Sequence, residues 1–211
     1  MPDAKAVDYG IAITPAQGEA LARFAELIRR WSRFAKLVSR EDETRIHERH
    51  LKDSLSLVAV LAQLENPLRI ADVGSGAGLP GVPLAVVLPE AHVTLIERSA
   101  KKSRFLERVA MELSLPNVDV VCDDVVNVTA KYDVVVSRAV MAPDKLWPLA
   151  FRILRAEGHM MVLDRVHDAG AGPPADSVEA FPGGIVTRRS WSQMPESRAL
   201  HGVLVVRCQA S

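Results

Sequence analysis

One glycine-rich stretch, residues 68–81 (LRIADVGSGAGLPG), limits what this chain can fold into more than any other. Apolar residues lead into Asp72, and glycines then stand at positions 74, 76, 78 and 81. Glycine adopts backbone angles that other residues resist, and it lets a ligand come close to the main chain. Proline fits the first turn of a helix, where its missing N–H costs nothing. The pattern therefore predicts a buried strand from Leu68 to Val73, a glycine turn, and a helix that begins near Pro80.

Strand–turn–helix units of this kind commonly bind a nucleotide, and the glycine spacing bears on which one. The dinucleotide fingerprint G-x-G-x-x-G fails when counted from Gly74, because position 79 is Leu, but it fits when counted from Gly76. The run Asp72-x-Gly-x-Gly-x-Gly resembles the first motif of class I S-adenosylmethionine (AdoMet) methyltransferases. AdoMet has no pyrophosphate and needs a carboxylate for its ammonium group, which favours this interpretation. A plain tight turn of an α/β domain is the structural alternative.

The bulk composition restricts the class of protein. The chain has 211 residues, enough for one domain or one domain with an extension. No apolar run reaches about 18 residues, and the polar amino-terminal residues do not resemble a signal peptide. Two cysteines, Cys122 and Cys208, give neither a disulfide framework nor metal-ligand spacing. We therefore expect a cytoplasmic protein with no membrane span and no metal site.

A first helix is expected to begin at Thr14 and Pro15, which suit an N-cap and a first helical turn. Apolar residues recur at helical spacing from Leu21 to Trp31 and predict one buried stripe. The net charge of zero argues against an indiscriminate nucleic-acid binder but allows a local basic face. Candidates for such a face are Arg29, Arg30, Arg33, Lys36, Arg98, Lys101, Lys102 and Arg104. Their simpler interpretation is a solvated helix surface.

A second amphipathic helix is expected from Ser39 to the break at Asn66-Pro67. Arg49 and Asp53 are four residues apart and could pair on one face, and His50 could also meet Asp53. The inward-facing residues of this helix are expected to be Ile46, Leu51, Leu55 and Val58.

Strands and helices alternate after the glycine turn, which predicts an α/β fold with a parallel sheet. Further strands are expected at 92–97, 118–122, 132–137, 158–163, 185–191 and 203–208, with the last two as an antiparallel edge. Helices are expected at 99–113 and 143–154, and a loop at 168–184.

Ligands of open parallel sheets bind at the carboxyl ends of the strands, so the residues there are candidate site residues. Glu97 ends the second strand and can accept hydrogen bonds from both ribose hydroxyls of an adenosine. Asp124, Val125 and Val126 follow the third strand and could edge and cover an adenine, although the two valines could equally be core. Arg138 ends the fourth strand beside the ligand crevice, where an exposed ion pair is the alternative.

Four motifs together resemble one known family, the bacterial 16S ribosomal RNA guanine-N7 methyltransferases (RsmG, formerly called glucose-inhibited division protein B). The motifs are DVGSGAGLPGVP from Asp72, RHLKDS from Arg49, K-x-RFL from Lys102, and VSRA at 136–139. They occur in order and at matching spacing over residues 15–165.

The resemblance implies a Rossmann-like class I AdoMet-dependent fold with a mostly parallel seven-stranded sheet. It implies a helical extension at 1–63, packed on an AdoMet-binding domain at 64–211. Gly74 and Leu79 would contact AdoMet, Val125 and Val126 would flank its adenine, and Arg138 would lie at the outer edge of the pocket. Val126 replaces a residue that is usually acidic in the family, so a contact there would use the main chain. The full expected cofactor-binding set is Gly74, Gly76, Gly78, Leu79, Glu97, Asp124, Val125, Val126 and Arg138.

The activity implied is methylation of N7 of one guanosine in 16S ribosomal RNA, with the RNA or the small-subunit particle as partner and a monomeric enzyme. N7 of guanine carries no proton, so no general base and no particular catalytic residue is expected. Three other functions stay open from the residues alone. They are a dinucleotide-dependent oxidoreductase, a methyltransferase for another RNA, a small molecule or a protein, and a non-catalytic RNA-binding protein.

Overall fold

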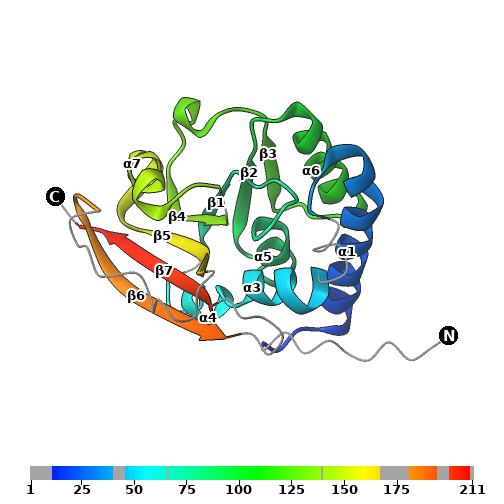
Figure 1. Ribbon diagram of the computed structural model, residues 1–211, viewed down its shortest axis with the longest axis horizontal. Coiled ribbons are helices and arrows are strands. Elements are labelled where there is room, and N and C mark those ends of the chain that lie inside the picture. The colour runs from blue at the N-terminus through cyan, green and yellow to red at the C-terminus, as the bar shows by residue number, and fades with distance from the viewer. Residues whose placement is uncertain are drawn as a thin grey trace.

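The computed structural model describes residues 11–39, 46–65, 67–138, 140–166, 181–193 and 200–209. Within these residues, seven strands form one sheet in the order β3-β2-β1-β4-β5-β7-β6 (Figure 1). The strands are β1 (Arg69–Val73), β2 (His92–Ile96), β3 (Val118–Val121), β4 (Tyr132–Arg138), β5 (Leu154–Val166), β6 (Gly184–Gln193) and β7 (Leu200–Cys208). The first five pair in parallel, and β7 runs antiparallel to both β5 and β6. The predicted mostly parallel sheet with an antiparallel edge is confirmed.

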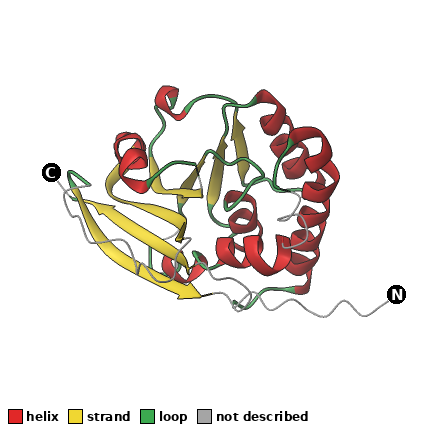
Figure 2. Cartoon of the chain, in the orientation of Figure 1, coloured by secondary structure: helices red, strands yellow, loops and turns green. Residues whose placement is uncertain are grey.

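Helices cover the two faces of this sheet unequally (Figures 1 and 2). The described helices are α1 (Pro15–Ala35), a π-helix η1 (Ile46–Leu51), α3 (Lys52–Leu55), α4 (Val58–Leu61), α5 (Gly81–Val87), α6 (Ala100–Glu112), a 3₁₀ turn η2 (Val125–Asn127) and α7 (Pro143–Ile153). Buried side chains of α1, α3, α5 and α6 share one hydrophobic cluster, whereas α7 packs in a second cluster. The amino-terminal helices therefore lie on the same face as α5 and α6.

Alternation along the central strands divides the core between these two clusters. In β4, Val134 and Val136 belong to the cluster under α5, while Val135 between them belongs to the cluster under α7. Successive side chains of a strand point to opposite faces, so a continuous apolar run is buried on both sides. The same rule places Ile70 and Ala71 of β1 in different clusters. This two-sided burial explains the apolar run of Val134, Val135 and Val136 in β4.

The first helix forms as its sequence predicts. The Thr14 hydroxyl accepts a hydrogen bond from the Gln17 amide at 3.2 Å, and the Gln17 side chain accepts one from the Thr14 amide at 2.8 Å. This reciprocal capping box satisfies two amide groups that the helix itself cannot. Leu21, Phe24 and Leu27 are among the fully buried residues of the stripe.

The second amphipathic helix differs from its prediction, because the described residues 46–61 form three short pieces. Ser54 donates its hydroxyl to the His50 carbonyl at 2.7 Å, and Ser56 donates to the Asp53 carbonyl at 2.7 Å. Such side-chain bonds compete with the helical hydrogen-bond ladder. Ile46, Leu51 and Leu55 are buried as predicted, and Val58 is half-buried and packs against the same cluster, while Leu57 and Val60 are buried in addition. Residues 40–45 lie outside the described residues, so capping by Ser39 is not tested.

Strand β5 begins earlier than its sequence indicates, at Leu154 and not at Gly158. It pairs with β4 through a register shift near Tyr132, and Glu157 has a positive φ of 60°. Leu154 pairs with Tyr132 of β4, whereas the pairing of β5 with β7 begins at His159. Most of the expected loop 168–184 lies outside the described residues, but Gly184 begins β6, and Phe181 packs edge-on against Trp147 with ring centroids 6.0 Å apart.

Candidate active site

A pocket of about 450 Å³ opens where β1, β2, β3 and β4 end. This is the carboxyl edge of the parallel strands, where ligands of such sheets bind. Its lining residues come from five separate parts of the chain. They are Leu37, Val38, Val73, Gly74, Ser75, Gly76, Ala77, Leu79, Ile96, Glu97, Arg98, Lys102, Asp123, Asp124, Val125, Arg138, Val140 and Met141.

The glycine turn forms one wall of the pocket with its backbone. Gly74 and Gly76 have φ values of +70° and +56°, which side-chain-bearing residues rarely adopt. The amides of Gly74 and Ser75 both donate to the Ile96 carbonyl, at 2.9 and 3.1 Å. A Cβ on Gly74 would come within 2.4 Å of Val140. The loop is therefore fixed against β2 and closely packed against the segment that follows β4.

Glu97 holds this loop from the end of β2. Its Oε2 accepts a hydrogen bond from the Gly76 amide at 3.0 Å, and its Oε1 accepts one from the Ser99 amide at 2.8 Å. The side chain is 7% exposed but still lines the pocket. Each carboxylate oxygen can accept more than one hydrogen bond. Glu97 is therefore fixed in orientation while it keeps acceptor capacity for ligand hydroxyl groups.

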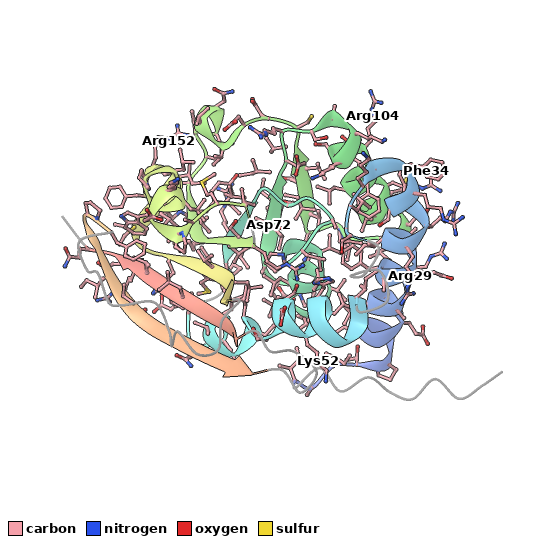
Figure 3. The ribbon with its side chains drawn as sticks, in the orientation of Figure 1. Arg29, Phe34, Lys52, Asp72, Arg104 and Arg152 are labelled. Atoms are coloured by element: carbon pink, nitrogen blue, oxygen red, sulfur yellow. The ribbon has the colours of Figure 1, made fainter. Side chains whose placement is uncertain are left out.

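Asp72 lies beneath the glycine turn, at the centre of the molecule, and does not line the pocket (Figure 3). Its Oδ2 accepts a hydrogen bond from the Gly81 amide at 2.9 Å. Its Oδ1 is buried without a hydrogen-bond partner among the described residues. Burial raises the pKa of this carboxyl to about 7, against the opposing effect of the Gly81 hydrogen bond. Asp72 therefore supports the turn from below and places a titratable carboxyl close to the ligand.

Gly78 is one of two members of the expected set that do not line the pocket. A Cβ there would lie 2.7 Å from Val82, 3.1 Å from Leu106 and 3.3 Å from Phe24. Gly78 is therefore required by the packing of α1, α5 and α6 against the turn. The neighbouring Leu79 does line the pocket.

The segment after β3 shapes the pocket opposite the glycine turn. Asp124 caps η2, where its Oδ1 accepts a hydrogen bond from the Val126 amide at 3.1 Å. Asp124 and Val125 both line the pocket, and Val125 is only 7% exposed. Val126 is 52% exposed and is not among the lining residues. A hydrogen bond from Asn127 holds the pKa of the adjacent Asp123 carboxyl below its usual value.

Arg138 joins the pocket to the amino-terminal helices. Its Nη2 donates to His50 Nδ1 at 2.6 Å, and its Nη1 lies 4.0 Å from Asp53 Oδ2. A guanidinium has donors and no acceptor, so His50 Nδ1 must be the unprotonated nitrogen in this contact. His50 is 3% exposed and lies in the π-helix, a form often found at functional sites. His50 and Asp53, expected to meet each other, instead both approach Arg138. The Arg49 side chain lies outside the described residues.

The sequence reasoning did not identify Leu37, Val38, Val140 and Met141 as pocket residues. Val140 and Met141 are exposed apolar side chains, 40% and 37% accessible, between β4 and α7. They carry no motif and belong to no periodic stripe. Leu37 and Val38 follow α1, and Val140 and Met141 follow β4. These four side chains reach the pocket only because both segments fold over the edge of the sheet.

The pocket suits AdoMet better than a dinucleotide. Its polar lining contains the carboxylates of Glu97, Asp123 and Asp124, which suit hydroxyl and ammonium groups, beside the cations of Arg98, Lys102 and Arg138. The first amides of α5 are already used, because Gly81 donates to Asp72 and Val82 donates to the Gly78 carbonyl. A dinucleotide would need such amides for its pyrophosphate.

The described parts of the chain also bear on metal binding and on membrane insertion. No group of three or more His, Cys, Asp or Glu side chains is placed there to hold a metal ion. No helix among the same residues is both long enough and apolar enough to span a bilayer.

Comparison with known structures supports the fold. A putative methyltransferase, yhhF, from Escherichia coli superposes with a TM-score of 0.55 at 17% identity, covering 76% of this chain and 88% of that one. A putative transferase from Pyrococcus horikoshii superposes with a TM-score of 0.58 at 15% identity, covering 95% and 66%. At these identities the likeness concerns the fold alone, and it confirms the predicted class I methyltransferase architecture.

Proteins found by sequence comparison share a higher identity with this chain than these solved structures do. The ribosomal RNA small subunit methyltransferase G of Aromatoleum aromaticum is 38% identical over 184 residues, covering 84% of this chain and 83% of that protein. The protein of the same name from Methylococcus capsulatus is 39% identical over 149 residues, covering 70% and 71%. The GidB family model, described as rRNA small subunit methyltransferase G, matches residues 17–169. The chain therefore belongs to the GidB family.

Proposed function

We propose that this protein transfers a methyl group from AdoMet to N7 of one guanosine in 16S ribosomal RNA. The observation that carries the proposal is the glycine-walled pocket at the strand ends, with Glu97 fixed beside the glycine turn, in a chain that belongs to the GidB family. The names of the relatives supply the small-subunit ribosomal RNA as the substrate. The methyltransferase fold and the family imply AdoMet as the donor.

In this proposal the residues of the pocket hold and orient the donor. Glu97 accepts hydrogen bonds from the ribose hydroxyls, while the Gly74–Gly76 backbone lies against the amino-acid part of the ligand. Val125 covers the adenine, and Asp124 offers a carboxylate at its edge. When bound, AdoMet supplies an electrophilic methyl group on a sulfonium. The buried Asp72 carboxyl and Glu97 favour that positive charge from below.

No proton has to be removed for the reaction. The N7 lone pair of guanine forms a bond to the methyl carbon as the carbon–sulfur bond breaks, and the electrons of that bond stay on sulfur. The protein therefore has to align three atoms and exclude water, and such orientation can contribute about 7–11 kcal/mol. Apolar Leu37, Val38, Val140 and Met141 suit the exclusion of water at the pocket mouth.

Arg138 has a role beside the reacting ring and not on it. Methyl transfer places positive charge on guanine, which a guanidinium in contact with the ring would oppose. His50 and Asp53 draw the Arg138 guanidinium toward the amino-terminal helices. Arg138 therefore orients donor or RNA from the edge of the pocket.

The proposed enzyme acts as a monomer in the cytoplasm on ribosomal RNA or on a small-subunit particle. We further propose that residues 1–63 are an extension packed on an AdoMet-binding domain at 64–211. The shared hydrophobic cluster of α1, α5 and α6 supports the packing of the extension on that domain. Because the target base lies in a folded RNA, it has to be presented or flipped before transfer.

The test is incubation of the purified protein with methyl-labelled AdoMet and unmodified 16S ribosomal RNA or small-subunit particles. We expect label at N7 of a single guanosine, which selective cleavage at 7-methylguanosine can map. The Glu97→Ala variant is the control for dependence on the pocket. Label on another base, or on a protein, would disprove the proposed reaction.

A further inference from the structure

Helices α1 and α6 lie beside each other (Figure 1) and run antiparallel. Near one end of the pair, Arg23 Nη2 lies 2.8 Å from Glu112 Oε2. Farther along, the rings of Trp31 and Phe105 lie with centroids 5.8 Å apart. The carboxyl end of α1 therefore lies beside the amino end of α6. Leu37 and Val38 continue from α1 into the pocket wall.

Charge is separated along this pair of helices. Residues 27–39 and 98–106, at the pocket end, contain eight lysines and arginines and no acidic residue. The four acids of the two helices, Glu19, Glu26, Glu107 and Glu112, all lie outside these two segments, toward the far end. The ion pairs described within the helix pair, Arg23 with Glu26 and Glu112, and Arg108 with Glu112, lie at that far end too. In a chain of zero net charge, this gathers positive charge beside the pocket.

Phe34 lies within this basic end and is 66% exposed (Figure 3). It follows Arg23 and Arg30 at intervals of eleven and four residues, so all three lie on one flank of α1. The ion pair between Arg23 and Glu112 indicates that this flank of α1 faces α6. The pairing of Trp31 with Phe105 then places Phe34 across from the first turns of α6, which carry Lys101 and Arg104.

The position of Phe34 also relates it to the pocket. Leu37 lines the pocket and is three residues farther along the chain, so the two backbones are within roughly 10 Å. A single exposed apolar side chain is common and needs no special explanation by itself. An aromatic ring surrounded by cations beside a ligand pocket, however, matches the surfaces that bind unpaired nucleic acid, where bases stack on rings and cations follow phosphates.

We propose that the carboxyl end of α1 and the amino end of α6 form the RNA-docking face, on which Phe34 stacks against an unpaired base close to the target guanosine. This inference rests on the proposed function and adds the surface and the mode of contact. Arg30, Arg33, Lys36, Lys101 and Arg104, all exposed, contact the phosphates of the same strand. A protein partner would be expected to meet an apolar patch and not a lone ring among cations.

The test compares RNA binding and methylation by wild type, Phe34→Ala, Phe34→Trp and Phe34→Leu. Met111→Ala is the matched control, because Met111 is 63% exposed at the far end of α6. We expect Phe34→Ala to weaken RNA binding by about 10-fold, within the range known for base–aromatic stacking, while AdoMet affinity stays unchanged. The Trp variant retains binding, whereas the Leu variant resembles Ala because it cannot stack.

The charges are tested separately through salt dependence. The double variant Arg33→Gln/Lys101→Gln is expected to reduce the slope of log Kobs against log salt by about 1.5, because each phosphate that is no longer neutralised lowers it by roughly 0.7–0.9. Arg23→Gln, on the same helix but paired with acids, leaves the slope unchanged. Phe34→Ala lowers affinity without changing the slope, because stacking releases no counterions.

The results separate this inference from the proposed function. If wild type methylates the RNA but Phe34→Ala binds it as tightly as Met111→Ala does, the docking face is wrong and the function stands. Full binding by Phe34→Leu overturns stacking. An effect of Phe34→Ala on particles but not on bare 16S RNA indicates a protein contact and also overturns the proposal. Absence of methylation by wild type overturns the proposed function itself.

Discussion

The glycine wall and the rim of the pocket are built in different ways. The wall consists of the Gly74–Gly76 backbone and Glu97. The Gly76 amide donates to Glu97 at 3.0 Å, and the amides of Gly74 and Ser75 donate to the Ile96 carbonyl at 2.9 and 3.1 Å. The rim consists of side chains that come together only in the fold, those of Leu37, Val38, His50, Asp53, Arg138, Val140 and Met141. We infer that the wall fixes the methyl donor and that the rim governs the approach of the RNA. Each prediction below tests one side of this division.

The largest effect is expected for Asp72→Asn, a change beneath the glycine wall that alters the free energy of unfolding. Burial raises the folded-state pKa of Asp72 to about 7. The protonated carboxyl is tolerated in the core, so its favourable contribution to the free energy of unfolding is complete below pH about 4 and is lost as the pH rises through 7. Asn keeps an acceptor for the Gly81 amide and never ionises. At pH 8 we expect the variant to be more stable by up to about 4 kcal/mol and to bind AdoMet more weakly.

Urea unfolding between pH 5 and pH 8 measures this effect. Wild type is expected to lose stability relative to the variant by about 1.4 kcal/mol per pH unit up to pH 7, and the two are expected to match only near pH 4 and below. An equal pH slope in both proteins would show that Asp72 is already ionised in the folded state at pH 5.

The next effect is expected in the wall, for Glu97→Ala. The amides of Gly76 and Ser99 lose the carboxylate that accepts their hydrogen bonds. The ribose hydroxyls of the methyl donor lose the same proposed acceptor. Hydrogen bonds to charged groups contribute about 1.5–3 kcal/mol each, so AdoMet affinity is expected to fall by about 100-fold or more. Calorimetric titration with S-adenosylhomocysteine, which shares the ribose and adenine of AdoMet, measures this loss of affinity. The Glu97→Gln variant keeps one acceptor oxygen and is expected to lose less affinity. A change of less than about threefold would remove Glu97 from the donor site.

A smaller effect with a different pattern is expected in the rim, for His50→Ala. Arg138 loses the acceptor that holds it at 2.6 Å, at a cost of about 1.5–3 kcal/mol. We expect kcat/KM for the RNA to fall by about 10-fold or more, with little change in AdoMet affinity. His50→Gln offers a new acceptor and is expected to restore part of the activity. An equal loss of AdoMet affinity would mean that the rim also holds the donor.

The smallest effect is expected for Val126→Ala, compared with Val125→Ala. Val126 is 52% exposed and away from the pocket lining, whereas Val125 is 7% exposed and lines it. Loss of two buried methyl groups is expected to weaken AdoMet binding by roughly 10-fold for Val125→Ala and by less than about twofold for Val126→Ala. The reverse order would show that Val126 turns toward the adenine when the donor binds.

Local sequence predicted most of the sheet and the glycine wall. Each strand from β1 to β4 was located within one or two residues, because a parallel sheet buries continuous apolar runs between recognisable turns. Glu97 and Gly74 could be identified because each follows a strand directly. The same rule did not show that Gly78 packs against helices, since the glycines of one motif look alike until their neighbours are known.

The rim could not be predicted in this way. Leu37, Val140 and Met141 have no motif, and nothing along the chain shows that residue 50 meets residue 138. The amphipathic pattern after Ser39 indicated one helix, but serine side chains bonded to carbonyls divide its described part into short pieces. One of those pieces, the π-helix, contains the His50 that contacts Arg138.

The sequence by itself determined the alternation of strands and helices, the glycine turn and the carboxylate at the end of β2, because these depend on local backbone preference and on burial with a short period. Only the tertiary structure decided that Asp72 lies below the pocket, that His50 and Asp53 approach Arg138, and that the basic ends of α1 and α6 lie together. Those arrangements depend on contacts between segments far apart in the chain, which local preferences do not encode.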